Sequence, residues 1–573
     1  MEYRQASCGS GAREPTFLRV GDVVPDFAAS STKGTIHFHR WIKGKWTVFF
    51  SHPAAFTPVC TTELGMLASV QPTLEQLGFR VVAMSCDDVA QHVEWERDIE
   101  HHFEGKVGIN FPIIGDSSRD VAVKLGMVDP EMRGKDVMPL TSRTVFIIGP
   151  DGRLHLLMDY PDFVGRSAKE LLRVCRSLVL CARLYIATPA SWPDNHGTLT
   201  VDGKSMAGAV CVHSSISDKE VARRFSASKT FALPSGKKYM RLALVPDSPP
   251  QSTCWEGLVR CLPCGRPRGD DPSDTWSALV SAQPRYSTPS MVKLVPVGRD
   301  AKSALEKRAR GMEKFACLYG RSTDGHLRHG DTMPDFNADT TRGRINFHRY
   351  IGGYWTVLYV VPRAFSPVAT TELGTLALLY HNFVAKRIRV LAVSAETVPD
   401  LGEWEKDIVA HFGLKQQLQF PLVSDVLQDI ASQFAVDIDD LPASGGDVPF
   451  LPRSMFIIAP DKTLKLVVSY PAEVGFDVHE ILRVCDALQL STRESIATPA
   501  CWPNNHPDLK DEAGRSMQGA VFPLDTVAKS DVQSFFPQRV DVQLPSGRKY
   551  MTLAKIDDAG RMPLCAGCVS FGT

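Results

Sequence analysis

A threonine and a cysteine, Thr57 and Cys60, stand three residues apart in a segment that could support thiol chemistry. Thr57-Pro58 is a favourable helix start, with threonine as the N-cap and proline at the first helical position. Cys60 would then lie in the first turn of a helix, where unpaired backbone N–H groups and the helix dipole stabilise a thiolate. This position would suit a nucleophilic cysteine, and the alternative interpretation is a small buried hydrophobe.

The same segment recurs later in the chain without its thiol. Residues 361–374 repeat residues 52–65, with Cys60 replaced by Ala369, Thr57 by Ser366 and His52 by Val361. Packing alone gives no reason for a thiol in one copy and none in the other. The difference indicates that Cys60 carries chemistry that the second copy lacks.

The repetition extends over a whole domain. Residues 36–40 match 345–349, residues 186–193 match 496–503, and residues 233–240 match 544–551. A unit of about 230 residues is far longer than the roughly 20–50-residue period of a solenoid, so the chain is a tandem duplication. We divide it into an active domain at 15–246, a linker at 247–326, a degenerate domain at 327–559 and a tail at 560–573.

Strands and helices around Cys60 must position it. The run Trp46–Phe50 is β-branched and aromatic, which favours a buried strand, and apolar residues after Cys60 recur at helical spacing. Further strands are expected at 80–85, 111–114, 144–148 and 154–158, with helices at 89–102 and 167–181. This alternation favours an α/β fold of thioredoxin type.

These residues together resemble a known family. Pro53-x-x-x-Thr57-x-x-Cys60 resembles the active-site motif of the peroxiredoxins, and its surroundings resemble the 1-Cys (peroxiredoxin 6) subgroup. Matching segments lie at 50–53, 56–63, 111–114, 125–130 and 233–239, together with Trp95. The resemblance covers both repeats nearly end to end. It implies two tandem thioredoxin-like domains, each with a C-terminal extension, packed as a pseudo-dimer.

The resemblance implies an antioxidant thiol peroxidase that reduces hydrogen peroxide and organic hydroperoxides through a cysteine sulfenic acid. The implied site residues are Cys60 as nucleophile, Thr57 as hydrogen-bond partner of the peroxide, Pro53 as a shield from water, Arg143 as stabiliser of the thiolate and the peroxide, His52 in contact with the cysteine, and Glu63 orienting the arginine. Structural alternatives remain, because Pro53 could simply end a strand and Arg143 could merely pair with Glu63.

The chain departs from other family members in two places. Residues 186–193 contain no resolving cysteine, which favours a 1-Cys mechanism with an external thiol such as glutathione or a thioredoxin-like protein. Lys45 stands where some subgroup members have a phospholipase serine, so lipase activity is not expected. No cofactor or metal is expected at the site. A redox-regulated chaperone or scaffold that uses Cys60 as a peroxide sensor is the alternative function, although Arg143 and Thr57 favour catalysis.

Two Cys-x-x-Cys pairs, Cys261/Cys264 and Cys565/Cys568, lie just beyond the two repeats. Two such pairs could bind zinc, or one could act as a redox pair that resolves Cys60. They could also be free thiols in flexible segments. The sequence leaves these three interpretations open.

Composition excludes several other classes. The 573 residues contain 64 Lys plus Arg and 64 Asp plus Glu, so no basic excess indicates binding to nucleic acid or to an anionic membrane surface. No apolar stretch approaches the roughly 20 residues that span a bilayer, and the N-terminus lacks the apolar core of a secretory signal. The 14 scattered cysteines do not suggest a disulfide scaffold, and we expect a cytoplasmic protein. Further homodimerisation of the whole chain is left open.

Overall fold

The computed structural model describes residues 17–128, 140–195, 200–201, 204–213, 216–245, 327–434, 453–506, 509–524, 527, 532 and 535–556. The predicted linker, the tail and both Cys-x-x-Cys pairs lie outside the described residues.

The first repeat alternates strands and helices as the sequence predicts. Its elements are β1 (Ala28–Ser31), β2 (Gly34–His37), α1 (Phe38–Ile42), β3 (Trp46–Ser51), α2 (Pro58–Gln76), β4 (Phe79–Ser85), α3 (Val89–His102), β5 (Ile113–Gly115), α4 (Asp120–Lys124), β6 (Arg143–Ile148), β7 (Leu154–Tyr160) and α5 (Ala168–Leu184). The strand expected at 111–114 begins only at Ile113, because Pro112 has no N–H to donate to a ladder.

A C-terminal extension follows α5. It contains β8 (Thr200–Val201), β9 (Lys204–Ser205), β10 (Val210–Cys211), α6 (Asp218–Arg224), β11 (Ala227–Thr230) and β12 (Arg241–Leu244). Strands β10, β12 and β11 form a small antiparallel sheet of their own.

The second repeat follows the same order. Its elements are β13 (Asn337–Ala338), β14 (Ile345–Asn346), α10 (Phe347–Ile351), β15 (Trp355–Val360), α11 (Pro367–Leu378), α12 (Tyr380–Ala385), β16 (Ile388–Ser394), α13 (Val398–Phe412), β17 (Leu422–Ser424), α14 (Asp429–Gln433), β18 (Arg453–Ile458), β19 (Leu464–Tyr470) and α15 (Val478–Glu494), with β20 (Ile496–Ala497), β21 (Phe522–Pro523), β22 (Arg539–Asp541) and β23 (Thr552–Ala554) in its extension.

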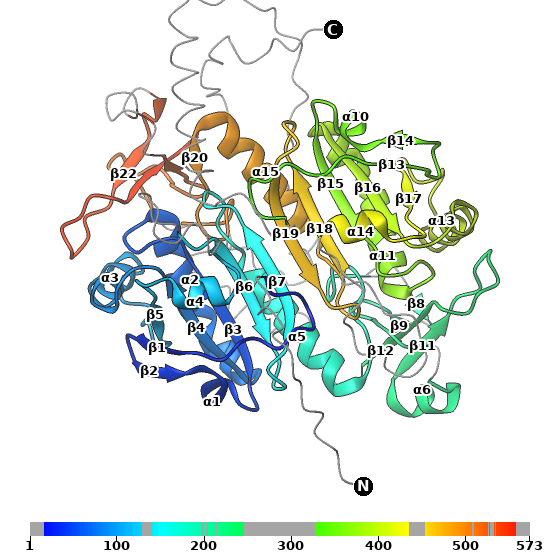
Figure 1. The fold of residues 1–573 in the computed structure, drawn as a ribbon, viewed down its shortest axis with the longest axis horizontal. Coiled ribbons are helices and arrows are strands. Elements are labelled where there is room, and N and C mark those ends of the chain that lie inside the picture. The colour runs from blue at the N-terminus through cyan, green and yellow to red at the C-terminus, as the bar shows by residue number, and fades with distance from the viewer. Residues whose placement is uncertain are drawn as a thin grey trace, which may run out of the picture.

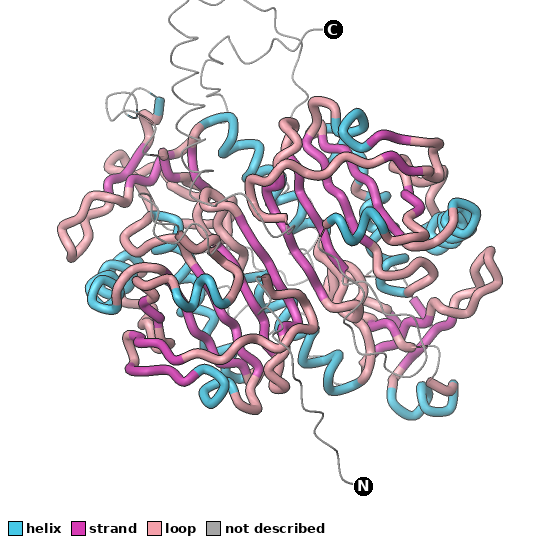
Figure 2. The backbone as a smooth tube through the Cα atoms, viewed as in Figure 1, coloured by secondary structure: helices cyan, strands magenta, loops and turns pink. Residues whose placement is uncertain are grey.

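One mixed sheet of 12 strands runs through both repeats, in the order β17-β16-β15-β18-β19-β7-β6-β3-β4-β5-β1-β2. The two halves meet where β19 pairs antiparallel with β7, with Val468 opposite Met158. Figure 2 shows the strands crossing the centre of the molecule as one layer. Apolar side chains of both repeats form one buried cluster beside this sheet. The repeats therefore share a core as well as a ladder.

The extension of each repeat lies against the other repeat. In Figure 1 the β22 region of the second repeat lies near α3 of the first, and β8 to β12 lie beside the second repeat. Ser546 of the second extension hydrogen-bonds Asp98 on α3, and Ser235 of the first extension hydrogen-bonds Asp407 on α13. No helix in the described part of the chain is long and apolar enough to cross a membrane.

Candidate active site

Helix α2 begins at Pro58, so the predicted helix start is confirmed and Cys60 lies in its first turn. The Cys60 side chain is completely buried. Thr57 occupies the N-cap position as predicted, but its side chain makes no capping hydrogen bond, and its Oγ1 donates to the carbonyl of Ala54 at 3.0 Å. The hydroxyl is therefore turned back into the loop that precedes Cys60.

Arg143 reaches Cys60 from the first position of β6. Its Nη1 donates to Cys60 Sγ at 3.2 Å and to Glu63 Oε2 at 2.6 Å, while its Nε donates to the carbonyl of Asp162 at 2.7 Å. Burial by itself would lower the pKa of Arg143, but the neighbouring Cys60 and Glu63 raise it above its ordinary value. The guanidinium therefore stays charged beside the sulfur.

A second arginine, Arg166, completes the cluster, and our sequence reasoning missed it. It holds Glu63 through three bonds: Nε and the backbone N–H donate to Oε1 at 2.8 and 2.9 Å, and Nη2 donates to Oε2 at 2.9 Å. Its guanidinium also lies 3.3 Å from the centre of the Phe50 ring. The two repeats differ at this position, since Gly165-Arg166 corresponds to Gly475-Phe476. A difference between the repeat with the thiol and the repeat without it could have pointed to Arg166.

The charges around Cys60 do not cancel. Glu63 is fully buried, and although burial would raise its pKa, Arg166 and Arg143 lower it below the ordinary carboxyl value. One carboxylate thus faces two guanidinium groups. A net positive charge next to the sulfur favours any negative charge that develops on a bound peroxide.

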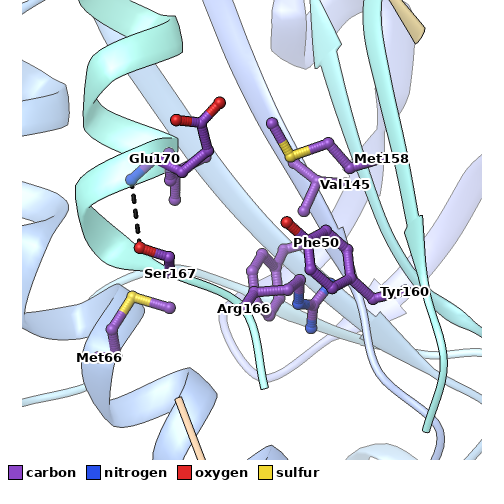
Figure 3. A pocket seen from close by; sticks show the side chains of 9 residues that line it. Phe50, Met66, Val145, Met158, Tyr160, Arg166, Ser167 and Glu170 are labelled. Atoms are coloured by element: carbon purple, nitrogen blue, oxygen red, sulfur yellow. Dashed lines mark hydrogen bonds between the residues drawn. The ribbon is translucent and has the colours of Figure 1, made fainter. Parts of the chain in front are cut away.

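A small cavity borders Arg166 on the side of α5 (Figure 3). Its lining combines apolar side chains with Arg166 and Glu170. Glu170 is already paired with Arg173 through two bonds of 2.7 Å and accepts a bond from Tyr470 of the other repeat. The cavity therefore presents charged groups whose bonds are made within the protein, and we assign no ligand to it.

His52 and Pro53 follow β3 directly, and both are buried. Neither ring nitrogen of His52 makes a hydrogen bond among the described residues, and the ring lies 5.7 Å from that of His92 and 5.2 Å from that of Trp95. Burial, with further contributions from His92 and the two arginines, holds the pKa of His52 well below its ordinary value. His52 is therefore neutral at physiological pH, and no hydrogen bond joins it to Cys60.

The corresponding site of the second repeat has a different chemistry. Arg453 donates to Glu372 and to the hydroxyl of Tyr359, at 2.7 Å for the latter, and Tyr359 itself donates to Glu372. Phe476 occupies the position of the second arginine, and its backbone N–H donates to Glu372 at 2.9 Å. Burial, only partly offset by Arg453, raises the pKa of Glu372 to about 7. This site has lost the thiol and also the excess positive charge.

The described residues contain no group of three or more His, Cys, Asp or Glu side chains that could hold a metal ion.

The chain is similar to a family model and to several known proteins. The model of the AhpC/TSA family matches residues 20–156 and 329–467. The chain is 42% identical over 234 residues to peroxiredoxin-6 of Gallus gallus, covering 40% of this chain and 99% of that protein. It is 40% identical over 230 residues to peroxiredoxin-6 of Homo sapiens, covering 40% and 97%. A crystal structure of a cysteine-to-serine mutant of peroxiredoxin 6 from Arenicola marina is 42% identical, covers 40% of this chain and 100% of that one, and superposes with a TM-score of 0.36.

Proposed function

The chain belongs to the peroxiredoxin (AhpC/TSA) family and is a thiol-dependent peroxidase of the 1-Cys type, and we propose that Cys60 is its only peroxidatic residue. One observation carries this assignment. The buried Cys60 Sγ accepts a hydrogen bond from Arg143 Nη1 at 3.2 Å, within a cluster of two guanidinium groups and one carboxylate. The second repeat offers alanine at the same position.

The proposed reaction has two stages. The Cys60 thiolate attacks the distal oxygen of the hydroperoxide and forms an S–O bond while the O–O bond breaks. The leaving oxygen takes up a proton and departs as water or an alcohol, and the sulfur is oxidised to sulfenic acid. Arg143 stabilises the charge that shifts along the O–O bond, since its guanidinium is already in place before the reaction begins.

An external thiol regenerates the enzyme in our proposal. It attacks the sulfenic sulfur and releases water to give a mixed disulfide, and a second thiol frees Cys60 as the two external sulfurs form a disulfide. Glutathione and a thioredoxin-like dithiol are the reductants to compare. The excess positive charge favours turnover over the alternative of a peroxide sensor with a chaperone or scaffold role, because a sensor needs less stabilisation of the transition state.

We further propose that the two repeats of one chain act as an intramolecular pair. Their common sheet supports this proposal, as does the close approach of Gly165 to Pro499, where an added Cβ would lie 2.3 Å from the Pro499 carbonyl carbon. Gly475 approaches Pro189 in the same way, with 2.6 Å for the equivalent contact. Crosslinks between these loops within monomeric chains are expected, and two domains that tumble independently in scattering data would contradict the pairing.

Arg143→Ala is expected to slow the oxidation of Cys60 by hydrogen peroxide. The loss of one preorganised donor typically costs about 2–4 kcal/mol of transition-state stabilisation, or roughly 30- to 1000-fold in rate. Stopped-flow measurement of the single-turnover rate tests this. Arg453→Ala is the matched control, because it removes the equivalent buried arginine from the repeat without a thiol. An unchanged rate in Arg143→Ala would remove this arginine from the reaction.

Placing a cysteine at position 369 is expected not to create a second peroxidase site. In a Cys60→Ser chain, Ala369→Cys would put a thiol next to Arg453, but Phe476 supplies no second guanidinium and Tyr359 already occupies both Arg453 and Glu372. Adding Phe476→Arg and Tyr359→Phe should restore measurable oxidation. Rapid peroxide consumption by the Ala369→Cys variant alone would show that the second arginine is dispensable.

A further inference from the structure

The extension of the second repeat covers the helix turn that carries Cys60. Asp98 on α3 is completely buried, and the described donors to its carboxylate belong to the other repeat. Ser546 donates to it twice, from the backbone N–H at 2.9 Å and from Oγ at 2.6 Å, and the Tyr550 hydroxyl donates at 3.0 Å. Three donors on one buried carboxylate attach the segment 544–551 firmly to α3.

The same segment contacts both chain neighbours of Cys60. The Tyr550 hydroxyl lies 3.4 Å from Oγ1 of Thr61, which also accepts a bond from Trp95 at 3.0 Å. Val59 is buried in an apolar cluster whose other buried members all come from the second repeat, namely Ala497, Met517, Ala520, Phe522, Leu544, Met551 and Leu553. The first turn of α2 is therefore packed between its own domain and the extension of the other.

The loop before α2 is held in the same way. Phe56 adopts a left-handed backbone conformation, with φ of 53°, which is costly for a side chain of this size. The Arg548 guanidinium lies 3.7 Å from the centre of the Phe56 ring, and Arg548 Nη2 is 3.1 Å from Glu94 on α3. The second repeat thus supports the loop from its outer side.

Complete burial of Cys60 raises a problem for the second stage of the reaction. A hydroperoxide is small, but a thiol reductant must bring its own sulfur against the sulfenic sulfur, and the Cys60 side chain has no exposed surface. The first turn of α2 must therefore open locally before reduction. Local opening is governed by the contacts that it breaks, and several of those contacts belong to the second repeat.

We infer that Ser546 and Tyr550 of the degenerate repeat, acting on Asp98, are positioning residues that set how readily oxidised Cys60 becomes accessible to its thiol reductant. This inference rests on the proposed function, because it concerns the reduction of the Cys60 sulfenic acid. The inference assigns a function to the repeat that lacks the thiol. Its extension keeps the first turn of α2 closed during the reaction with peroxide, and breaking these contacts opens the turn for the reaction with the thiol reductant.

The extension of the first repeat makes the equivalent contact with the second repeat, and this contact provides a matched control within the same chain. Ser235 donates to Asp407 on α13 from its backbone N–H at 2.8 Å and from Oγ at 2.6 Å, and Tyr239 lies with its hydroxyl 3.3 Å from Thr370 Oγ1. These residues hold the turn that carries Ala369. Substitutions of Ser235 or Tyr239 break the same kind of contact between the repeats without changing the contacts of the turn that carries Cys60.

The experiment compares Tyr550→Phe and Ser546→Ala with Tyr239→Phe and Ser235→Ala in the full-length chain. Each chain is oxidised with one equivalent of hydrogen peroxide, and the sulfenic acid is trapped with dimedone, which forms a thioether at the sulfenic sulfur and releases water. Loss of one hydrogen bond to a buried carboxylate should raise the open population, and hence the trapping rate, about tenfold. The KM for glutathione should fall in parallel, and the rate of oxidation by peroxide should change far less.

Tyr239→Phe and Ser235→Ala should react with dimedone at the wild-type rate. Equal dimedone trapping rates in all four variants and the wild type would overturn the inference. An equal increase in Tyr239→Phe and Ser235→Ala would also overturn it, since that would reflect general loosening of the contacts between the repeats. If Tyr550→Phe unfolds, Ser546→Ala retains the tyrosine and tests the same carboxylate. A wild-type chain that forms no dimedone-reactive Cys60 would contradict the proposed function itself. Normal trapping in the wild type with no change in Tyr550→Phe or Ser546→Ala would contradict only the inference about these two residues.

Discussion

Cys60→Ser is expected to abolish rapid peroxide reduction by the full-length chain. A serine hydroxyl is not ionised at neutral pH and does not attack the O–O bond at a comparable rate, so the whole catalytic advantage of the site is lost. The single-turnover reaction with hydrogen peroxide, followed by stopped flow, measures this directly. A Cys60→Ser chain that reacts at the wild-type rate would overturn the assignment of the peroxidatic residue.

Other cysteines provide the control. Burial raises the pKa of Cys86 to about 12 and that of Cys181 to about 12 as well, so both thiols are protonated at neutral pH. Neither has a guanidinium group donating to its sulfur among the described hydrogen bonds, whereas Cys60 accepts one from Arg143. Cys86→Ser and Cys181→Ser should therefore leave the first oxidation step at its wild-type rate. A large loss in either variant would indicate a second cysteine in the reaction.

Glu63→Gln is expected to be among the most destabilising single substitutions in the first repeat. Glu63 is fully buried and forms ion pairs with both Arg143 and Arg166. An amide in its place leaves those charges buried without a counter-ion, and removing one member of a buried ion pair typically costs about 3–5 kcal/mol of stability. Urea denaturation, followed by tryptophan fluorescence, measures the change in the free energy of unfolding.

Glu372→Gln is the matched variant in the second repeat and should cost much less. Glu372 faces one arginine, and its pKa of about 7 means that it is substantially protonated at neutral pH, so a neutral amide is a closer replacement. Equal losses in the two variants would show that the excess positive charge around Glu63 does not decide the outcome.

The two carboxyl groups should also affect stability in opposite directions as the pH changes. The folded-state pKa of Glu63 lies below the ordinary carboxyl value of 4.5, so its contribution to stability is present above pH 4.5 and is lost as the pH falls through the lower folded-state value. The folded-state pKa of Glu372 is raised, so the fold loses stability as the pH rises from 4.5 through about 7. Unfolding curves of Glu63→Gln and Glu372→Gln, measured across this range against the wild type, separate the two contributions.

Local sequence patterns were sufficient to predict the elements that carry the nucleophile. The strand at Trp46–Phe50, the helix start at Pro58 and the helix at 89–102 agree with β3, α2 and α3. Each depends on interactions between residues close in the chain. Thr57 is the N-cap as predicted, but residue preferences did not predict that its hydroxyl donates to the carbonyl of Ala54 and makes no capping hydrogen bond.

Arg166 shows where single-sequence reasoning about the site ends. It lies 106 positions beyond Cys60 in the chain, and its contact with Glu63 depends on how the loop after β7 crosses the start of α2. Within the sequence, its role was indicated only by the difference between the repeats, which have Arg166 in one and Phe476 in the other. Ion pairs between distant segments leave no periodicity in the sequence.

The sequence by itself determined that this protein is a duplication in which only one repeat has the motif cysteine, because a repeat and a missing thiol can be read from residue identities alone. The tertiary structure decided what surrounds Cys60: the second arginine, the pairing of β7 with β19 between the repeats, and the extension of the other repeat that contacts the turn of Cys60. The physical reason is that long-range contacts are selected by the burial of charge and apolar surface in the complete fold. That selection brings Tyr550 onto Asp98 across more than 400 residues of chain.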